Sequence, residues 1–568
     1  MNTASFRTRI RIVAAGIFLF ACVLVLKLFY LGVIHKDAYA ERADKQYATP
    51  SGDMFNRGNI FLTKKDGTLI AGGNVMTGFK VAIKAKDIKD PEATYELLAP
   101  YLNIDHDEFI KEALNVADPY EEVAQRLTKE QADYIESLKI SGVSIFKQKW
   151  RFYPADSLAA HALGFVAFKG DERVGQYGLE RFYNSTLMKP TEELYVNFFA
   201  EVFSNIGKTF SKNKKGDIIT SIEPTVQSLL EQEMAATIEH WNADAMGAII
   251  MDPQTGAIYA MSSMPDFDLN NFGKVENPRL YSNPIVENVF EFGSVIKPLV
   301  VAGALDQGVI TPETTYTDNG SVKVGKEEIF NFDKKGRGVT TMQGVLDESL
   351  NTGMVFIEKQ MGHDKFRAYM KNYGLGEKTG IDLPNETSGL ISNLDSPRDI
   401  EYATASFGQG IAMTPIEAVT AFASIANGGT LVTPHLVREI KYDDGTSFTP
   451  LFLPARTGLM KKESADTTTR MLVHVFESYG QGSYKIANHS VATKTGTAQV
   501  ARDDGKGYYE DRHMHSFFGY FPAYEPRFIV FFYLKNPKGV RYASQTLIPP
   551  FVNVTKFLLN YYNIPPDR

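Results

Sequence analysis

A serine and a lysine stand three residues apart at the start of a long apolar run, and this stretch limits the fold more than any other. Residues 291–305 read EFGSVIKPLVVAGAL. The run predicts a helix over 294–307, apolar on nearly all sides and therefore buried, with Gly308 as its stop. Positions i and i+3 share a helix face, so Ser294 and Lys297 point the same way. Pro298 is tolerated near a helix start, which places the pair at the N-terminus, where free N–H groups favour an oxyanion.

The Ser-x-x-Lys pattern is short, and it occurs three times in the chain. Ser144 and Lys147 lie in an alternating, strand-like stretch, and Ser211 and Lys214 lie in a polar run that predicts a solvated loop. Because such short patterns recur by chance, a single match carries little weight without its context. The context favours the match at Ser294 and removes the other two.

Composition excludes several classes of protein. The 568 residues carry a net charge of −7 and show no basic stripe, so nucleic acid is not expected as a partner. Cys22 is the single cysteine, which excludes disulfides, cysteine-based metal sites and a cysteine nucleophile in the rest of the chain. His513 and His515 have a metal-like spacing but no third ligand at a suitable spacing, so we expect no metal and no cofactor.

The N-terminus predicts a membrane anchor. Three arginines at positions 7, 9 and 11 precede an apolar run over residues 12–34, which is long enough to span a bilayer. The positive-inside rule then puts residues 1–11 in the cytoplasm and the rest outside it. A signal-peptidase site at 38–40 and a lipoprotein site at 19–22 are the alternatives. We favour an uncleaved single-pass helix in the cytoplasmic (inner) membrane, because the apolar run exceeds a usual signal-peptide core and continues past Cys22.

Two further domains follow the anchor. Residues 35–216 form a mixed α/β pedestal with an Asp-Gly hairpin at 66–67 and small helices within 87–140, and a polar run ends this domain. Residues 217–568 have two early strands, three late strands and a helical middle. This pattern predicts an α+β fold, an antiparallel sheet flanked by helices. The predicted strands are 248–251, 257–261, 490–500, 515–521 and 528–535; the predicted helices of the middle are 294–307, 341–360, 364–373 and 415–427.

A serine nucleophile needs a base, and the chain supplies candidates for the other parts of such a site. Lys297 can be that base if burial or a second cation lowers its pKa. Ser349 offers a relay hydroxyl, and Asn351 offers an amide that can bind a peptide group. Lys-Thr-Gly occurs at 378–380, in a loop, and at 494–496, in a strand where Gly496 would let a ligand backbone approach closely. A substrate peptide could pair along that strand, so we prefer the second copy.

The three motifs in this order resemble those of the class B penicillin-binding proteins, which are monofunctional peptidoglycan D,D-transpeptidases. The similarity covers most of residues 55–568 and includes Arg57-Gly58 and Gly178-Leu179-Glu180 in the pedestal. It implies the penicillin-binding transpeptidase fold on an elongated, dimerisation-like pedestal. Two positions depart from the family pattern: Phe292 stands where the family usually has Pro, and Thr493 stands where it usually has Gly. The pedestal's Arg-Gly segment also lacks the family's following Asp-Arg pair.

The resemblance implies a role for each site residue. Ser294 would attack the D-Ala–D-Ala carbonyl of a stem peptide, Lys297 would take its proton, and Ser349 would relay the proton to the leaving group beside Lys494. Asn351 would hold the substrate amide. The hydroxyls of Thr495 and Thr497 would bind the terminal carboxylate, and the N–H groups of Ser294 and Thr497 would form the oxyanion hole. β-Lactams would acylate Ser294 as substrate mimics.

The resemblance also implies partners, and it leaves alternatives open. A membrane-embedded glycosyltransferase of the SEDS family is the expected partner, together with other division or elongation membrane proteins. The sequence leans slightly toward division. A β-lactamase or β-lactam sensor using the same site is one rival, and a catalytically silent scaffold of the division or elongation machinery is another.

Overall fold

The computed structural model describes residues 55–117, 120–170, 172–189, 214–502 and 507–568, together with three single residues near the N-terminus. The segments predicted as cytoplasmic tail and membrane helix, 1–11 and 12–34, lie outside the described residues apart from those three. Within the described ranges, every helix is too short or too polar to cross a bilayer. Contacts divide the chain into two units: residues 76–150 form most of unit 1, and residues 56–75, 151–190 and 194–568 form unit 2.

Unit 1 is a small α/β body with its own core. The helices α3 (Pro91–Leu98), α4 (His106–Leu114) and α5 (Lys129–Ser137) confirm the helices predicted within 87–140. Their N-termini are capped by Asp90, Asp105 and Thr128, whose side chains accept bonds from backbone N–H groups. The sequence analysis missed β3 (Glu121–Leu127), which pairs with the end of β2 (Leu69–Ile83). The sequence of β3 is rich in charged residues and lacks the apolar pattern of a strand, because its extended form depends on its pairing with β2.

Unit 2 begins with the pedestal sheet. β1 (Ile60–Thr63) forms the predicted hairpin with β2, and its other edge pairs in parallel with β7 (Gly216–Thr220), which continues to β15 (Val437–Tyr442). Arg57 is buried beside this sheet. Its Nε donates to Glu180 at 2.5 Å, and Arg151 Nε donates to the other carboxylate oxygen at 2.6 Å. Arg57, part of the Arg-Gly segment that resembles the family's pedestal, is therefore a structural ion-pair residue.

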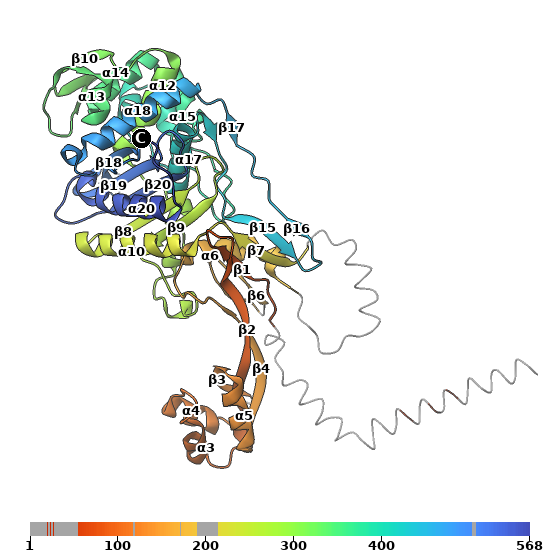
Figure 1. The fold of residues 1–568 in the computed structure, drawn as a ribbon. Coiled ribbons are helices and arrows are strands. Elements are labelled where there is room, and N and C mark those ends of the chain that lie inside the picture. Colours follow the sequence, from red (N-terminus) through yellow and green to blue (C-terminus); the bar gives the residue numbers. More distant parts are fainter. Residues whose placement is uncertain are drawn as a thin grey trace, which may run out of the picture. The chain divides into compact units, whose positions relative to one another are not determined.

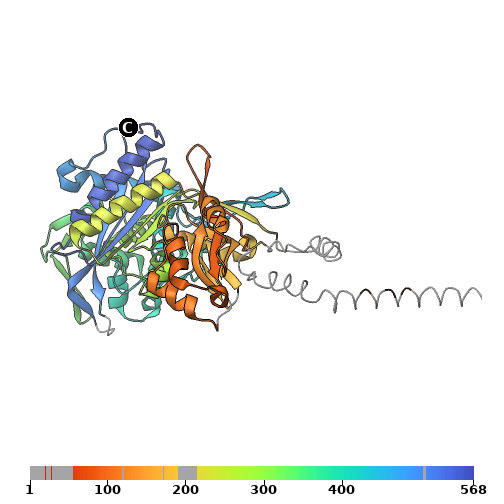
Figure 2. The same cartoon turned by 90° about the horizontal axis from the view of Figure 1, so that it is seen from below.

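The predicted antiparallel sheet of five strands lies at the centre of unit 2, in the order β18-β19-β20-β8-β9. Side chains alternate between its two faces, so Phe517 packs on one side and Phe518 on the other. Helices α10 and α20 lie side by side against one face (Figure 2), and α17 and α18 lie against the other, with α12 packed on both of them. The elements are β8 (Ala245–Met251), β9 (Ile258–Met264), β18 (Ala492–Ala501), β19 (Tyr508–Phe521), β20 (Phe528–Lys535), α10 (Pro224–Trp241), α12 (Lys297–Gln307), α17 (Pro415–Ala426), α18 (Lys462–Ser478) and α20 (Ile548–Tyr561).

The helical middle differs from the prediction at one functionally important place. The sequence predicted one helix over 341–360, whereas the structure has α13 (Met342–Asp347) and α14 (Asn351–Met361) with a break between them (Figure 1). Ser349 sits in the break with φ of +53°, a left-handed conformation that a helix interior does not allow. The apolar periodicity continues across the break, which is why the sequence concealed it.

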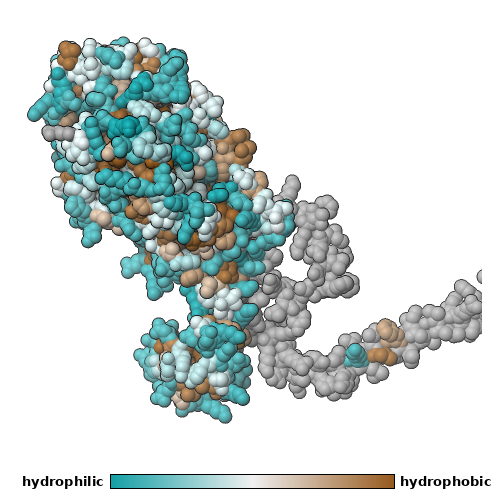
Figure 3. Space-filling view, viewed as in Figure 1, coloured by the Kyte–Doolittle hydropathy of each residue, from teal (hydrophilic) through white to brown (hydrophobic). Residues whose placement is uncertain are grey.

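The remaining elements complete the lobe and the pedestal. The strands β10 (Thr315–Asp318) and β13 (Gly338–Thr341) form one small sheet, and β11 (Ser321–Val324) and β12 (Glu327–Phe330) form another. Both small sheets adjoin α14. The remaining longer elements are β4 (Val143–Phe152), α15 (His363–Asn372) and α16 (Asp399–Ala405). In the view of Figure 3 the surface of the described residues is mainly hydrophilic.

Candidate active site

The nucleophile segment enters its helix through one tight turn. Residues Gly293–Ile296 form a 3₁₀ turn, in which Lys297 N–H bonds to the Ser294 carbonyl, and α12 follows directly. Pro298 has no N–H to continue an α-helical pattern from Ser294, so the tighter turn takes its place. Gly293 adopts φ of +64° and donates its N–H to the Gly408 carbonyl at 3.2 Å. The turn leaves Ser294 half-buried at the surface of a cleft and buries Lys297 completely.

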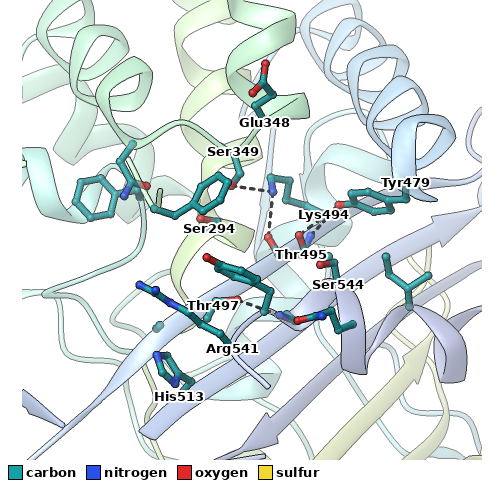
Figure 4. Close-up of a pocket in the computed structure, with 18 of the residues that line it drawn as sticks. Ser294, Glu348, Ser349, Tyr479, Lys494, Thr495, Thr497, His513, Arg541 and Ser544 are labelled. Atoms are coloured by element: carbon teal, nitrogen blue, oxygen red, sulfur yellow. Dashed lines mark hydrogen bonds between the residues drawn. The ribbon is translucent and has the colours of Figure 1, made fainter. Parts of the chain in front are cut away.

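The cleft has a volume of about 720 Å³ and lies between the edge strand β18 and the helical middle of unit 2 (Figure 4). Stretches far apart in the sequence supply its walls, among them the turn that carries Ser294, the break between α13 and α14, strand β18, and the loop after β20. Its lining includes Ser294, Ser349, Asn351, Lys494, Thr495 and Thr497. The structure therefore brings together six of the eight residues that the sequence analysis selected, and Lys297 lies directly behind them.

Ser349 joins the two lysines. Lys297 Nζ donates to the Ser349 carbonyl at 2.6 Å and lies 3.2 Å from its Oγ. Lys494 Nζ donates to the same Oγ at 3.1 Å and to the Thr495 carbonyl at 3.0 Å. Lys297 also donates to Asn351 Oδ1 at 2.9 Å. Among the described residues the Ser294 hydroxyl has no hydrogen-bond partner, so its proton is not committed to a structural contact.

Burial makes both lysines far weaker bases than in water. Burial, and then the charge of Lys494, hold the pKa of Lys297 well below its usual value. Burial lowers the pKa of Lys494 to about 7, against the opposing attraction of Asp347. Neither ammonium has a carboxylate at ion-pair distance within the described part of the chain. A lysine that is neutral near pH 7 can accept a proton from a serine, which is the condition that the sequence analysis set for this site.

A buried polar network fixes Ser349 and Asn351. The Asn331 side-chain oxygen accepts from the backbone N–H groups of Asn351 and Thr352 at 3.0 and 3.2 Å, which caps α14 from outside the helix. The Asn331 amide nitrogen in turn donates to both oxygens of Asp318 at 3.0 and 2.9 Å. Both Asn331 and Asp318 are only 2 % exposed. The cap fixes the start of α14 and therefore the position of the amide that contacts Lys297.

Strand β18 is an edge strand that borders the cleft. The N–H of Thr495 donates to Tyr479 Oη at 3.2 Å, away from the neighbouring strand β19. Backbone groups alternate in direction along an edge strand, so the N–H of Thr497 also points away from the sheet. The Thr497 Oγ accepts from the N–H of Ala543 at 3.1 Å, which leaves its proton free to donate into the cleft.

Gly496 has a different role from the one expected. The sequence analysis placed a ligand backbone beside it, but Gly496 does not line the cleft. A Cβ at this position would lie 2.4 Å from the Phe292 carbonyl oxygen and 2.9 Å from the Val295 nitrogen. The missing side chain therefore lets the nucleophile turn pack directly on β18, and Gly496 positions the site without facing the substrate.

The other Lys-Thr-Gly copy, at 378–380, lies in the loop predicted for it. The N–H groups of Thr379 and Gly380 donate to the Glu386 carboxylate at 2.6 and 3.1 Å. Lys378 and Thr379 line a separate cavity of about 40 Å³ that shares no lining residue with the cleft. This placement agrees with the choice of residues 494–496 as the copy that belongs to the site.

Residues 246–554, more than half of the chain, match the family described as the penicillin-binding protein transpeptidase domain. The chain belongs to this family. Residues 55–216 match the penicillin-binding protein dimerisation domain.

Relatives of the chain include a protein named as a peptidoglycan enzyme. It is 30 % identical to stage V sporulation protein D of Bacillus subtilis over 502 residues, which cover 86 % of this chain and 76 % of the relative. It is 27 % identical to the peptidoglycan D,D-transpeptidase FtsI of Escherichia coli, with 96 % and 91 % covered.

Among solved structures, penicillin-binding protein 2X of Streptococcus thermophilus shares the fold with a TM-score of 0.71 at 20 % identity, with 89 % of this chain and 80 % of that chain covered. Penicillin-binding protein 3 of Mycobacterium tuberculosis in complex with aztreonam gives 0.66 at 24 %, with 74 % and 92 % covered.

The two departures from the family pattern are absorbed by packing. Phe292 is fully buried and packs edge-on against Phe531, with ring centroids 5.0 Å apart. Its carbonyl accepts a bond from Ser516 Oγ at 2.6 Å. Thr493 is buried in β18 opposite Gly519, which leaves room for its side chain. Neither residue lines the cleft, so both contribute to the packing around the site of this penicillin-binding protein.

Of the two histidines with metal-like spacing, His515 has a structural role and His513 lines the cleft. His515 bonds Thr546 Oγ1 at 2.9 Å and the Arg541 carbonyl at 3.0 Å, and burial lowers its pKa to about 4. The described residues contain no cluster of His, Cys, Asp or Glu that could hold a metal ion. His161 is likewise buried and bonds the Leu280 carbonyl at 2.9 Å.

Sequence reasoning missed several residues of this site. Asn331 and Asp318 gave no signal, because a cap supplied from a distant loop has no local pattern. Tyr479 lies in a glycine turn after α18 and contacts Thr495, and the only available hint was that turn. Arg541 and Tyr542 line the cleft from the loop after β20, where the sequence shows only a loop.

Proposed function

We propose that this protein is a peptidoglycan D,D-transpeptidase that cross-links stem peptides through an acyl-enzyme on Ser294 and is acylated by β-lactams. The observation that carries the proposal is the meeting of two buried, weakly basic lysines at Ser349, directly behind the serine of the cleft. Membership of the transpeptidase family and relatives named as D,D-transpeptidases support the same chemistry.

Acylation begins with proton transfer from Ser294 to the neutral amine of Lys297. The Ser294 oxygen attacks the carbonyl carbon between the two D-alanines, and the N–H groups of Ser294 and Thr497 receive the oxyanion. The proton then passes through Ser349 to the leaving amine as the C–N bond breaks. Both lysines bond to Ser349, so this hydroxyl has the contacts that such a relay needs.

The rest of the cleft orients the substrate. Thr495 and Thr497 offer hydroxyls to the carboxylate of the terminal D-alanine, with the charge of Lys494 nearby. Asn351 would bind the amide of the donor peptide, although its oxygen already accepts from Lys297 and its nitrogen donates to the Phe330 carbonyl at 3.0 Å. An amine from a neighbouring strand then attacks the ester, which releases Ser294 and completes the cross-link.

We further propose that residues 12–34 anchor the protein in the cytoplasmic membrane with the transpeptidase domain outside the cytoplasm. The three arginines before the apolar run support this orientation. A SEDS-family glycosyltransferase that makes the glycan strands is the proposed partner, as the family resemblance implies. The similarity to stage V sporulation protein D and to FtsI supports a proposed role in division.

Labelling with a fluorescent penicillin tests the proposal. Wild type should be labelled covalently, and Ser294→Ala should not. Ser144→Ala is the matched control, because Ser144 belongs to another Ser-x-x-Lys match on the exposed side of β4 and should label like wild type. Equal labelling of Ser294→Ala, or no labelling of wild type, would favour a silent scaffold. Rapid turnover of the penicilloyl ester would favour a β-lactamase.

A further inference from the structure

The cleft has a direction, and its far end is not used by the chemistry described above. The hydroxyl of Thr495 and the ammonium of Lys494 mark the end that receives the terminal carboxylate. Ser294 and Thr497 mark the reacting carbonyl, so residues of the donor peptide before the reacting bond extend beyond Thr497 toward Gln499. Figure 4 shows Arg541 and His513 on that side of Thr497, opposite Lys494.

The loop that carries Arg541 is fastened to the strand that would hold the peptide. His515, which pairs with Thr497 in the sheet, bonds the Arg541 carbonyl at 3.0 Å. Two residues later, the Ala543 N–H bonds Thr497 Oγ at 3.1 Å. The backbone on both sides of Tyr542 is therefore fixed to the position that receives the oxyanion. A side chain on this loop keeps a defined distance from the reacting carbonyl.

Arg541 presents a positive charge to the cleft. Its side chain is exposed, and within the described part of the chain no carboxylate lies within 4 Å of it. In this Arg541 differs from Arg57, which pairs with Glu180, and from Arg337, which pairs with Glu348 at 2.6 Å. His513 beside it adds no positive charge at neutral pH, because burial and the charge of Arg541 lower its pKa. Glu510 is the carboxylate that lines the same end of the cleft.

We propose that Arg541 binds a carboxylate on the side chain of a donor-peptide residue that precedes D-Ala–D-Ala. The guanidinium fits a carboxylate through two parallel hydrogen bonds, whereas a side chain ending in an amine alone offers it nothing. Glu510 can receive an ammonium on the same side chain. The preferred donor therefore carries a diamino acid whose side chain ends in both a carboxylate and an ammonium. This inference rests on the proposed function and names the substrate class of the same site.

The test compares three synthetic donor pentapeptides that differ at one residue, with meso-diaminopimelate, its side-chain amide, or lysine before D-Ala–D-Ala. The release of D-alanine by the full-length protein gives kcat/KM for each donor. Wild type should favour the diaminopimelate donor over its amide by at least fivefold. Arg541→Gln should bring this ratio to about one, and Arg541→Lys should retain part of it.

Controls separate this inference from the proposed function. Arg512→Gln removes a guanidinium that stacks on Tyr509 and does not line the cleft, so it should keep the wild-type ratio. Equal use of the three donors by wild type, or an unchanged ratio in Arg541→Gln, would overturn the role of Arg541 and leave the transpeptidase reaction intact. If wild type releases no D-alanine from any donor and is not labelled by penicillin, the proposed function itself fails.

Discussion

Removal of the charge on Lys494 should move the pH dependence of acylation to higher pH. Both ammonium nitrogens contact Ser349 Oγ, at 3.2 and 3.1 Å, so they are at most about 6 Å apart. Two unit charges at that distance repel by about 3 kcal/mol at an effective dielectric constant near 20. Lys297 must be neutral to accept the proton, and the charge of Lys494 favours that state. In Lys494→Met the repulsion is lost, and the acid limb of the profile should rise by about one to two pH units.

Single-turnover acylation by a chromogenic β-lactam measures this effect. The second-order rate constant is followed between pH 5 and pH 10 for wild type, Lys494→Met and Lys494→Arg. Both variants lose the wild-type bond to Ser349, so both should be slower. Only the methionine variant loses the charge, so only its midpoint should shift.

Three results would refute this reasoning. If the midpoint of Lys494→Met stays where it is in wild type, the low pKa of Lys297 comes from burial alone. If the midpoint moves to lower pH, Lys297 is not the group whose deprotonation limits acylation. An equal shift in Lys494→Arg would assign the effect to lost packing and not to charge.

Three further substitutions test the frame of the site. Asn331→Ala removes the cap of α14, and it should slow acylation about tenfold and cost about 1 kcal/mol of stability. An unchanged acylation rate at the same loss of stability would contradict the positioning role of Asn331. Gly496→Ala forces a methyl group against the Phe292 carbonyl and should lower Tm and penicillin labelling together, at a cost of about 1–3 kcal/mol that urea unfolding measures.

In the same group, Glu180→Gln leaves two buried guanidinium groups without a countercharge and should cost about 3–5 kcal/mol in denaturant unfolding. Burial alone would raise the pKa of Glu180, but Arg151 and Arg57 outweigh it and lower that pKa. The stabilising contribution is thus present above the usual carboxyl pKa and lost as the pH falls through the folded-state value. Wild type should therefore lose stability on acidification more steeply than Glu180→Gln.

Much of the site could be predicted because its parts are short and local. A serine and a lysine on one helical turn, or a threonine on each side of a glycine in a strand, define their own geometry through backbone periodicity. The sheet of five strands was also predictable, since the side chains along its strands alternate between two faces that are both apolar. The break at Ser349 was not, because a residue with φ of +53° inside an apolar repeat depends on a cap from Asn331, eighteen positions earlier.

The sequence by itself selected the proposed nucleophile, its proposed base and the second cation, and it determined the α+β class of the domain that holds them. Only the tertiary structure decided how they act together. Burial sets the basicity of Lys297 and Lys494, and burial is a property of everything packed around them. The direction in which Arg541 faces, and the contact that Gly496 makes with the nucleophile turn, likewise depend on segments that meet only in the folded chain. Residue types select the possible chemistry, and long-range packing sets the charges and distances at which it occurs.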